Sequence, residues 1–195
     1  MKHTFPALIV LAFVAQASAA VAESPYKPSA TFQEVMDAVV DPAADYIWGA
    51  VATIADSKGI HELQPRTDKE WHEFRRRAVL LVEAANLIAV PGRKVAHGNH
   101  TLEDNGVLDP APIQARLDAN HAQLVGFADG LRQTAQKLVD AADRKDVNAI
   151  IEEGGTLDEV CEACHKVFWY PEDTGPYATP AAAPATAPAP APAKK

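Results

Sequence analysis

The sequence predicts an all-α fold, an antiparallel four-helix bundle, on three observations. Four long segments repeat apolar residues at steps of three and four, the spacing that keeps side chains on one face of a helix. No segment sustains the period-two alternation of a half-buried strand. Residues 20–173, which remain when the two biased ends are set aside, suffice for one core and not for two. Amphipathic helices without strands pack most simply as a bundle.

The first helix is expected over residues 30–57. Pro42 lies inside it, removes one backbone donor and clashes with the preceding turn, so we expect a kink there or a new start with Asp41 as N-cap. Gly59 should end the element. The apolar stripe of this helix consists of Phe32, Met36, Val39, Ala43, Ile47, Ala50 and Ile54.

The second helix should begin after Thr67-Asp68-Lys69-Glu70, a capping box in which hydroxyl and carboxylate each bond a free amide at a helix start. Pro91-Gly92 should end it. Residues 91–109 hold three glycines and no apolar period, which predicts a long connection. The stripe of the second helix is Trp71, Phe74, Ala78, Leu81, Ala85 and Ile88.

The third helix is expected over residues 111–143, with Asp109 as cap and Pro110 in the first turn. The fourth opens at Asp146. Gly154-Gly155 weakens its middle, and Thr156 with Glu159 offers a second capping box if the helix breaks there. Its apolar face holds Val147, Ile150, Leu157, Val160, Cys161, Cys164 and Phe168.

The two ends of the chain differ in composition from the helical region. Residues 1–19 have a short basic start, an apolar run and the small-residue cleavage site Ala17-Ser18-Ala19, which together predict a secretory signal peptide; a cut after Ala22 is nearly as good. The run is too short for a membrane anchor, so the mature protein should lie in the periplasm without a membrane span. Residues 174–195 are rich in Pro and Ala and should form a disordered tail.

The net charge and the sequence motifs restrict the classes of function that we expect for this chain. The chain has 18 Lys+Arg against 26 Asp+Glu, a net charge of −8, which disfavours nucleic-acid binding and makes a basic partner the better expectation. No carboxylate pair, nucleophile with a base, or phosphate-binding loop stands at a recognisable spacing, so we do not expect an enzyme.

The chemistry is concentrated in Cys161-Glu162-Ala163-Cys164-His165, the C-x-x-C-H pattern of c-type haem attachment, which contains both cysteines of the chain. On a helix Cys161 and Cys164 share a face and can add their sulfurs to the two haem vinyl groups, while His165 reaches the iron from the same side. One covalent haem c is therefore expected. Its attachment takes place on the exported side, where the predicted leader sends the chain.

Three other interpretations of the cysteine pair stay open. A zinc site would need further ligands, and the chain has no second cysteine pair. A thioredoxin-like redox pair needs a preceding strand that the sequence does not show. The third is a plain buried pair. Among other groups, Arg93 and Lys94 could pair with haem propionates, while His61, His97 and His100 lie where solvated side chains are the rule and His121 lies closer to an apolar seam.

A helical chain with C-x-x-C-H on its last helix resembles the class II c-type cytochromes, which include cytochrome c′. The resemblance implies thioether roles for Cys161 and Cys164 and an axial role for His165. Phe168, three residues past the histidine, sits where cytochromes c′ commonly have an aromatic. Basic residues are common in that family three before the first cysteine and four past the histidine, where this chain has Asp158 and Trp169.

Two functions follow from this reading. In the first, one-electron transfer to a redox partner protein, Met36 is the sixth iron ligand; it is the only methionine outside the leader, and its thioether suits haem iron and raises the potential. Six-coordinate class II cytochromes are similar in placing a methionine early in helix 1. In the second, Met36 only fills the core, and a five-coordinate iron binds nitric oxide or carbon monoxide, as the resemblance to cytochrome c′ implies. The resemblance also implies a homodimer through helices 1 and 2, which the apolar residues Val40, Tyr46 and Trp48 permit.

Overall fold

The computed structural model describes residues 26–98 and 107–170, which are mostly helical, as predicted. The predicted signal peptide at 1–19, with its alternative cut after Ala22, and the predicted tail at 174–195 lie outside the described residues. In chain order the elements are α1 (Phe32–Val35), the π-helical turn η1 (Met36–Val40), α2 (Asp41–Gly49), β1 (Ala52–Asp56), β2 (Gly59–Leu63), α3 (Asp68–Ala89), α4 (Pro110–Ala119), α5 (His121–Arg144) and α6 (Val147–Phe168).

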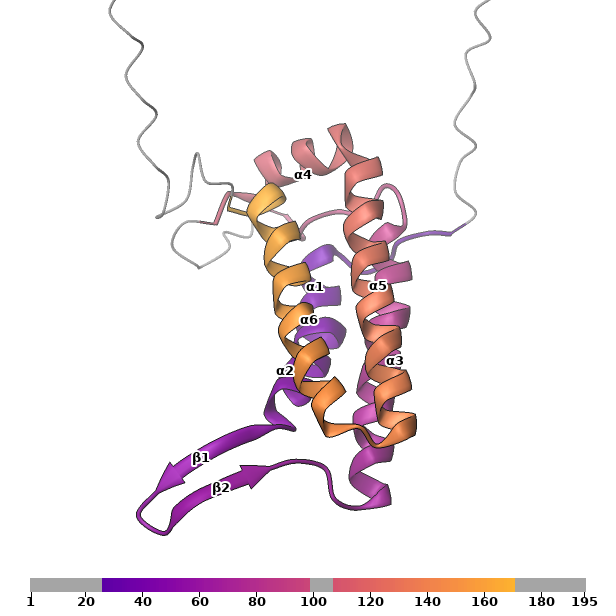
Figure 1. Ribbon diagram of the computed structural model, residues 1–195. Coiled ribbons are helices and arrows are strands. Elements are labelled where there is room, and N and C mark those ends of the chain that lie inside the picture. Colours follow the sequence, from indigo (N-terminus) through magenta and orange to yellow (C-terminus); the bar gives the residue numbers. More distant parts are fainter. Residues whose placement is uncertain (1–25, 99–106, 171–195) are drawn as a thin grey trace, which may run out of the picture.

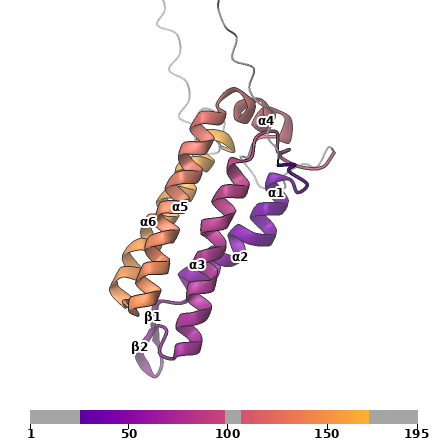
Figure 2. The same ribbon diagram turned by 90° about the vertical axis from the view of Figure 1, so that its right-hand side faces the viewer.

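The long helical segments of the described chain run side by side along one axis and alternate in direction (Figures 1 and 2). The continuous α1–η1–α2 segment and α5 both pack on α3, while α6 packs on α5 and α2. The short α4 lies across one end and contacts α5 and α6. The largest fully buried side chains fill the space between these helices: Phe32, Phe74, Phe168, Ile47, Leu81, Ile113, Leu117, Leu124, Leu138, Ile150 and Leu157.

Helix α3 matches its prediction closely. The Thr67 N–H donates to Glu70 Oε2 at 2.8 Å, and the Glu70 N–H donates to Thr67 Oγ1 at 3.3 Å, which is the expected capping box. The helix ends at Ala89, just before Pro91-Gly92. Its predicted stripe is buried from Trp71 to Ile88. No helix in the described ranges is both long and apolar enough to cross a lipid bilayer.

The prediction of a first helix over 30–57 is wrong in its last part. The helix ends at Gly49, and residues 52–63 form an antiparallel hairpin in which Ala52 pairs with Leu63 and Asp56 with Gly59. The residues after Gly49 include several β-branched side chains, which fit a strand better than a helix. The Lys58 N–H donates to Asp56 Oδ1 at 2.7 Å and closes the turn.

Pro42 does not start a new helix with Asp41 as its N-cap. The structure places Val40, not the predicted Asp41, at the N-cap of α2, with Pro42 in its first turn. Because Pro42 has no N–H for the Ala38 carbonyl four residues earlier, the regular α-helical ladder is interrupted there. The chain widens into η1, in which the Asp41 N–H donates to the Met36 carbonyl.

The last two predicted helices differ in outcome. The helix predicted over 111–143 is divided at Asn120, whose φ of −127° and ψ of 34° lie outside the helical region and whose side chain donates to the Arg116 carbonyl at 2.9 Å. In contrast, α6 runs without a break through Gly154-Gly155. Thr156 caps no second helix there, and its hydroxyl donates to the Glu152 carbonyl at 3.3 Å.

Candidate functional site

The C-x-x-C-H motif occupies the last two turns of α6. About two turns before the motif, α6 is held against α2 by Trp48, whose indole N–H donates to the Gly154 carbonyl at 3.0 Å. A Cβ at Gly154 would lie 3.9 Å from Trp48 Cδ1, an ordinary contact distance, so the indole lies close to the helix backbone here. The last turn ends with the Trp169 N–H donating to the His165 carbonyl at 2.8 Å.

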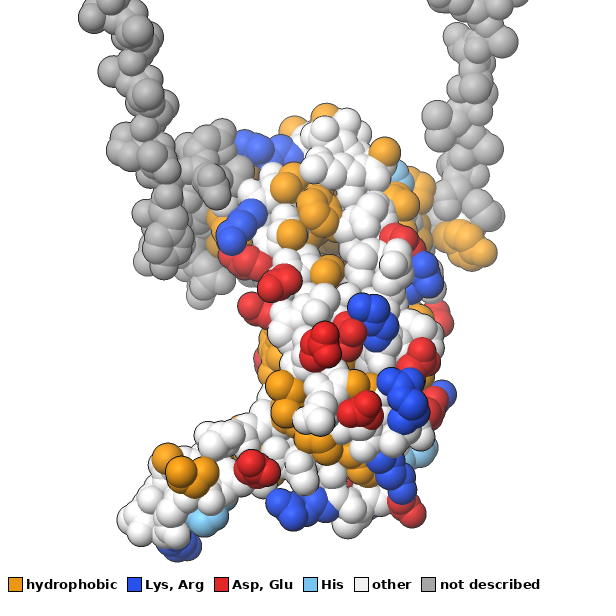
Figure 3. Space-filling model, viewed as in Figure 1, with side chains coloured by type: hydrophobic (Ala, Val, Ile, Leu, Met, Phe, Trp, Pro, Cys, Tyr) orange, Lys and Arg blue, Asp and Glu red, His pale blue; other side chains and the backbone are white. Residues whose placement is uncertain are grey.

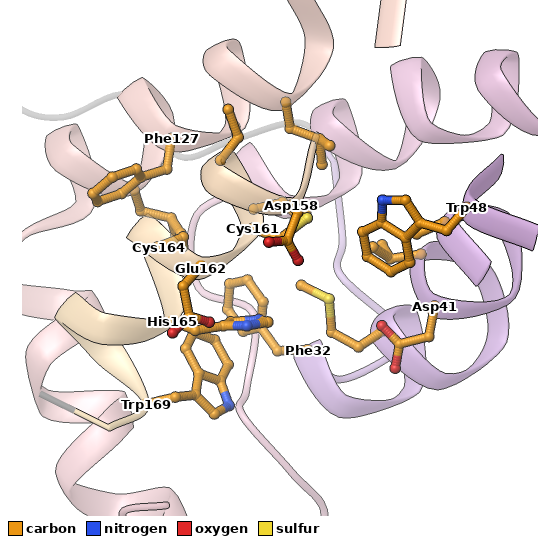
Figure 4. Close-up of a pocket in the computed structure, with 18 residues that line it drawn as sticks. Phe32, Asp41, Trp48, Phe127, Asp158, Cys161, Glu162, Cys164, His165 and Trp169 are labelled. Atoms are coloured by element: carbon orange, nitrogen blue, oxygen red, sulfur yellow. The ribbon is translucent and has the colours of Figure 1, made fainter. Parts of the chain in front are cut away.

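Both cysteines and His165 line one cavity of about 180 Å³ between α6 and the α1–η1–α2 segment (Figure 4). Met36 lines the same cavity from the opposite segment. The remaining wall is mostly apolar and is made by Phe32, Val40, Ala44, Trp48, Ile88, Leu124, Phe127, Ala128, Leu131, Val160 and Trp169, together with the carboxylates of Asp41, Asp158 and Glu162. The fold therefore brings together four of the five site residues predicted from the sequence.

The cysteine thiols are partly buried and neutral. Burial, followed by the nearby carboxylates Asp158, Asp41 and Glu162, raises the pKa of Cys161 to about 11. Burial, followed by the neighbouring Cys161, raises the pKa of Cys164 to about 12. Such thiols are poor thiolate nucleophiles at neutral pH, which argues against a thiol redox site.

The His165 imidazole is also neutral. Burial lowers its pKa, and the carboxylates of Glu162 and Asp41 oppose that shift only in part. Neutral imidazole has a free lone pair, which is the form that binds a metal. The ring is fixed from one side by Trp169, with ring centroids 5.6 Å apart, and by Tyr170 at 6.0 Å.

Met36 is half-buried and begins the π-helical turn η1. Single π-helical turns inside α-helices are frequent at functional sites, because the extra residue turns the following side chains away from the regular helical register. The spacing of apolar residues places Met36 on the core stripe of the first helix. In the structure, Met36 lines the cavity across from the C-x-x-C-H motif.

Phe168 takes a different place from the one expected. It is fully buried and does not line the cavity. Its ring packs edge-on against Phe127, with centroids 6.1 Å apart, and Phe127 is the residue at the cavity wall. Phe168 therefore lies outside the cavity and packs against Phe127, which lines it.

Several cavity residues were missed by the sequence analysis. Trp169 carried a signal, since it lies one helical turn after His165 and so shares its face. Asp41, Trp48 and Phe127 carried none, because each comes from a different helix than the motif and reaches it only through packing. Burial raises the pKa of the Asp41 carboxyl, and Asp37 adds to the shift.

The other sequence candidates have partners elsewhere. The buried Arg93 donates to the Leu87 carbonyl at 2.9 Å and to the Ala30 carbonyl, and so ties the end of α3 to the start of α1. His97 Nε2 lies 3.1 Å from Glu34 Oε2, and His121 Nε2 lies 3.2 Å from the Ala89 carbonyl oxygen. Of the histidines within 26–98 and 107–170, His165 alone lines the cavity.

Over the same ranges, no group of three or more His, Cys, Asp and Glu side chains is arranged to hold a metal ion. His100 lies outside the described residues. Comparisons with protein-family models, with curated proteins and with solved structures find no match to this chain.

Proposed function

We propose that this chain is a periplasmic c-type cytochrome that carries one covalent haem and transfers single electrons. The observation that carries the proposal is the convergence of Cys161, Cys164, His165 and Met36 on one largely apolar cavity. Haem c uses two cysteine thiols to bond its vinyl groups and, with Met/His ligation, an imidazole and a thioether to ligate the iron, and a cavity with mostly apolar walls suits its porphyrin.

Each residue has a defined role in this proposal. Cys161 and Cys164 would hold the haem through thioether bonds, His165 would be the proximal ligand and Met36 the sixth ligand. The haem iron supplies the change of one electron, and the protein sets the potential through ligand, burial and nearby charge. Trp169 would orient the imidazole through its ring contact, and the mostly apolar wall would surround the porphyrin.

The fold supports a family proposal as well. The side-by-side, alternating helices, with the motif at the end of the last one, fit an antiparallel four-helix bundle of the class II c-type cytochromes, and the resemblance read from the sequence points the same way. Asp158 lines the cavity where that family often has a basic residue, so any haem propionates here face a different set of charges.

One observation favours a second function. Met36 is the side-chain donor that faces the motif from η1, and the cavity wall around it is mostly apolar. If the Met36 thioether stays off the iron, the same apolar wall leaves room for a small gas. Five-coordinate binding of nitric oxide or carbon monoxide is therefore the alternative proposal.

Denaturing mass spectrometry tests the haem directly. The chain, produced with its leader in a bacterium that attaches haem c, should gain the mass of one haem that survives unfolding. Replacing both Cys161 and Cys164 by Ala should abolish the gain, whereas the exposed His72→Ala variant should keep it. Unmodified mature chain without the added mass would refute the proposal. If the haem is attached, a reversible one-electron titration of the loaded protein tests electron transfer.

A further inference from the structure

The β1–β2 hairpin stands away from the helical body (Figures 1 and 3). All ten of its strand residues are exposed, so neither of its faces is covered. A two-stranded hairpin that packs on nothing is at best marginally stable in water, and such ribbons usually gain their stability from a third strand or a helix. The hairpin therefore needs a surface to pack against.

The hairpin is also apolar for an exposed element. The exposed fraction is 76% for Ile60, 47% for Leu63 and 46% for Ile54. Near its base, Ile151 of α6 is 55% exposed. Figure 3 shows hydrophobic side chains on the visible face of the hairpin and on the adjoining end of the helical body.

A groove lies where the hairpin meets α6. Ala52, Thr53, Glu62 and Leu63 line it from the hairpin, and Val147, Asn148 and Ile151 line it from α6. A neighbouring hollow shares Ile151 and Val51 and extends along α6 to Gly154-Gly155. Glu62 is the one charged side chain in the groove and Asp158 the one in the hollow, and sparse charge is typical of the centre of a protein interface.

We propose that a second copy of this chain covers this surface, with the hairpin of each copy lying in the groove beside α6 of the other. The chain carries both the projecting arm and a groove with a single charged side chain, so a two-fold axis satisfies both copies at once. A groove poor in charge also suits self-association of a chain whose net charge is −8, because like charges then meet only at the rim.

The exposed apolar area matches what such a contact needs. Ile54, Ile60, Leu63 and Ile151, with the half-exposed Trp48 and Val51 beside them, present on the order of 400 Å² of apolar surface per copy. A standard interface buries roughly 800 Å² per partner, of which roughly 57% is apolar. The two areas agree in size.

Of the three residues named in the sequence analysis for a dimer face, Val40 and Tyr46 are less suited to this role than Trp48. Val40 is buried in the core, and the ring of Tyr46 lies beneath the Arg77 guanidinium, 5.3 Å from the ring centroid. These side chains already have partners within the chain.

The oligomeric state of the mature, full-length protein tests the proposal. Sedimentation equilibrium over about 1–200 µM should give a dimer. Ile60→Asp in the arm and Ile151→Asp in the groove should each raise the dissociation constant at least tenfold. Leu87→Asp, which alters a 41% exposed leucine near the other end of α3, should leave it unchanged. Circular dichroism should show the same helix content in all four proteins.

Mixing the two weakened variants tests the reciprocal geometry. Ile60→Asp keeps an intact groove and Ile151→Asp keeps an intact arm, so the mixture should form heterodimers more readily than either variant forms homodimers. An unmodified protein that stays monomeric would overturn the proposal. So would a dimer that tolerates both substitutions, or a mixture that associates no better than its components.

Discussion

The indole of Trp169 stands edge-on against the imidazole of His165, with ring centroids 5.6 Å apart and ring planes at 61°. Phe32 packs edge-on against the same indole, with centroids 6.0 Å apart. The Leu108 N–H donates to the Trp169 carbonyl at 2.8 Å and fixes the backbone there. The helix that holds the motif, the first helix and the segment before α4 therefore meet at Trp169, which restricts how the imidazole can turn.

Trp169→Leu should weaken both the fold and the orientation of His165. Loss of the two ring contacts and of the packed indole should lower the free energy of unfolding by about 1–3 kcal/mol, measured by denaturant titration. Trp169→Phe, which keeps an aromatic edge toward His165, should lose less. Equal losses in both variants would show that the ring contacts contribute nothing beyond side-chain volume.

The continuity of α6 through Gly154-Gly155 makes a second prediction. A Cβ at the exposed Gly155 meets no atom within 4 Å, so Gly155→Ala should raise the free energy of unfolding by about 0.5–1 kcal/mol through better helix propensity. Denaturant titration at low protein concentration measures it.

The matched control is Gly92→Ala, where the backbone has a φ of +77°. Alanine is strained in that conformation and should lower the stability by roughly 1–2 kcal/mol. A loss of stability in Gly155→Ala would mean that α6 does not run as a regular helix through this residue.

The helices were predictable where local signals and periodicity agreed. For α3, the capping box at Thr67, the stripe from Trp71 to Ile88 and the Pro91-Gly92 stop all indicate the same element. The hairpin was missed for two reasons. Ala50 and Ile54 continue the helical spacing by chance. Both faces of the strands are exposed, so their sequence does not need to alternate apolar and polar residues. Gly154-Gly155 weakens the helix propensity of α6 without breaking it, and the Trp48 indole hydrogen-bonds the Gly154 carbonyl there.

The site was predictable in its chemistry and only partly in its geometry. The spacing of Cys161, Cys164 and His165 follows from the helix alone, so the structure had to place them together. Met36 lies more than a hundred residues earlier, and only tertiary packing brings it to the same cavity. The position of Phe168 three residues after His165 did not predict its contacts. Phe127, which packs against Phe168, lines the cavity wall instead.

The capping box of α3 should make stability depend on pH. Backbone hydrogen bonds from Arg66 and Thr67 lower the pKa of the Glu70 carboxyl below its ordinary value of 4.5. A carboxyl whose pKa is lower in the folded state stabilises the fold fully above pH 4.5 and loses that contribution as the pH falls through the lowered value.

Glu70→Gln should therefore lower Tm at pH 7, and the difference from the unmodified protein should shrink toward zero near pH 3. Thermal melts followed by circular dichroism across this range measure it. Glu159→Gln removes the same charge from the exposed face of α6 and should change Tm less at pH 7. A Glu70→Gln deficit of constant size from pH 7 to pH 3 would contradict the role of the carboxylate.

The last prediction concerns Met36, because its role separates electron transfer from gas binding. Met36→Leu keeps an apolar side chain of similar volume and removes the thioether, so the cost in stability should stay below about 1.5 kcal/mol. If Met36 is the sixth ligand, the loaded variant should change from a low-spin to a high-spin spectrum, and its reduced form should bind carbon monoxide readily. Its reduction potential should fall by on the order of 0.1 V, because Met/His ligation raises the potential.

Met36→Ala should change the spectrum in the same way with a larger loss of stability, whereas Val39→Ala, at a half-buried position in the same turn, should leave the spectrum unchanged. An unmodified protein that is already high spin and binds carbon monoxide at once would show that Met36 only fills the cavity wall, and the gas-binding proposal would then replace electron transfer.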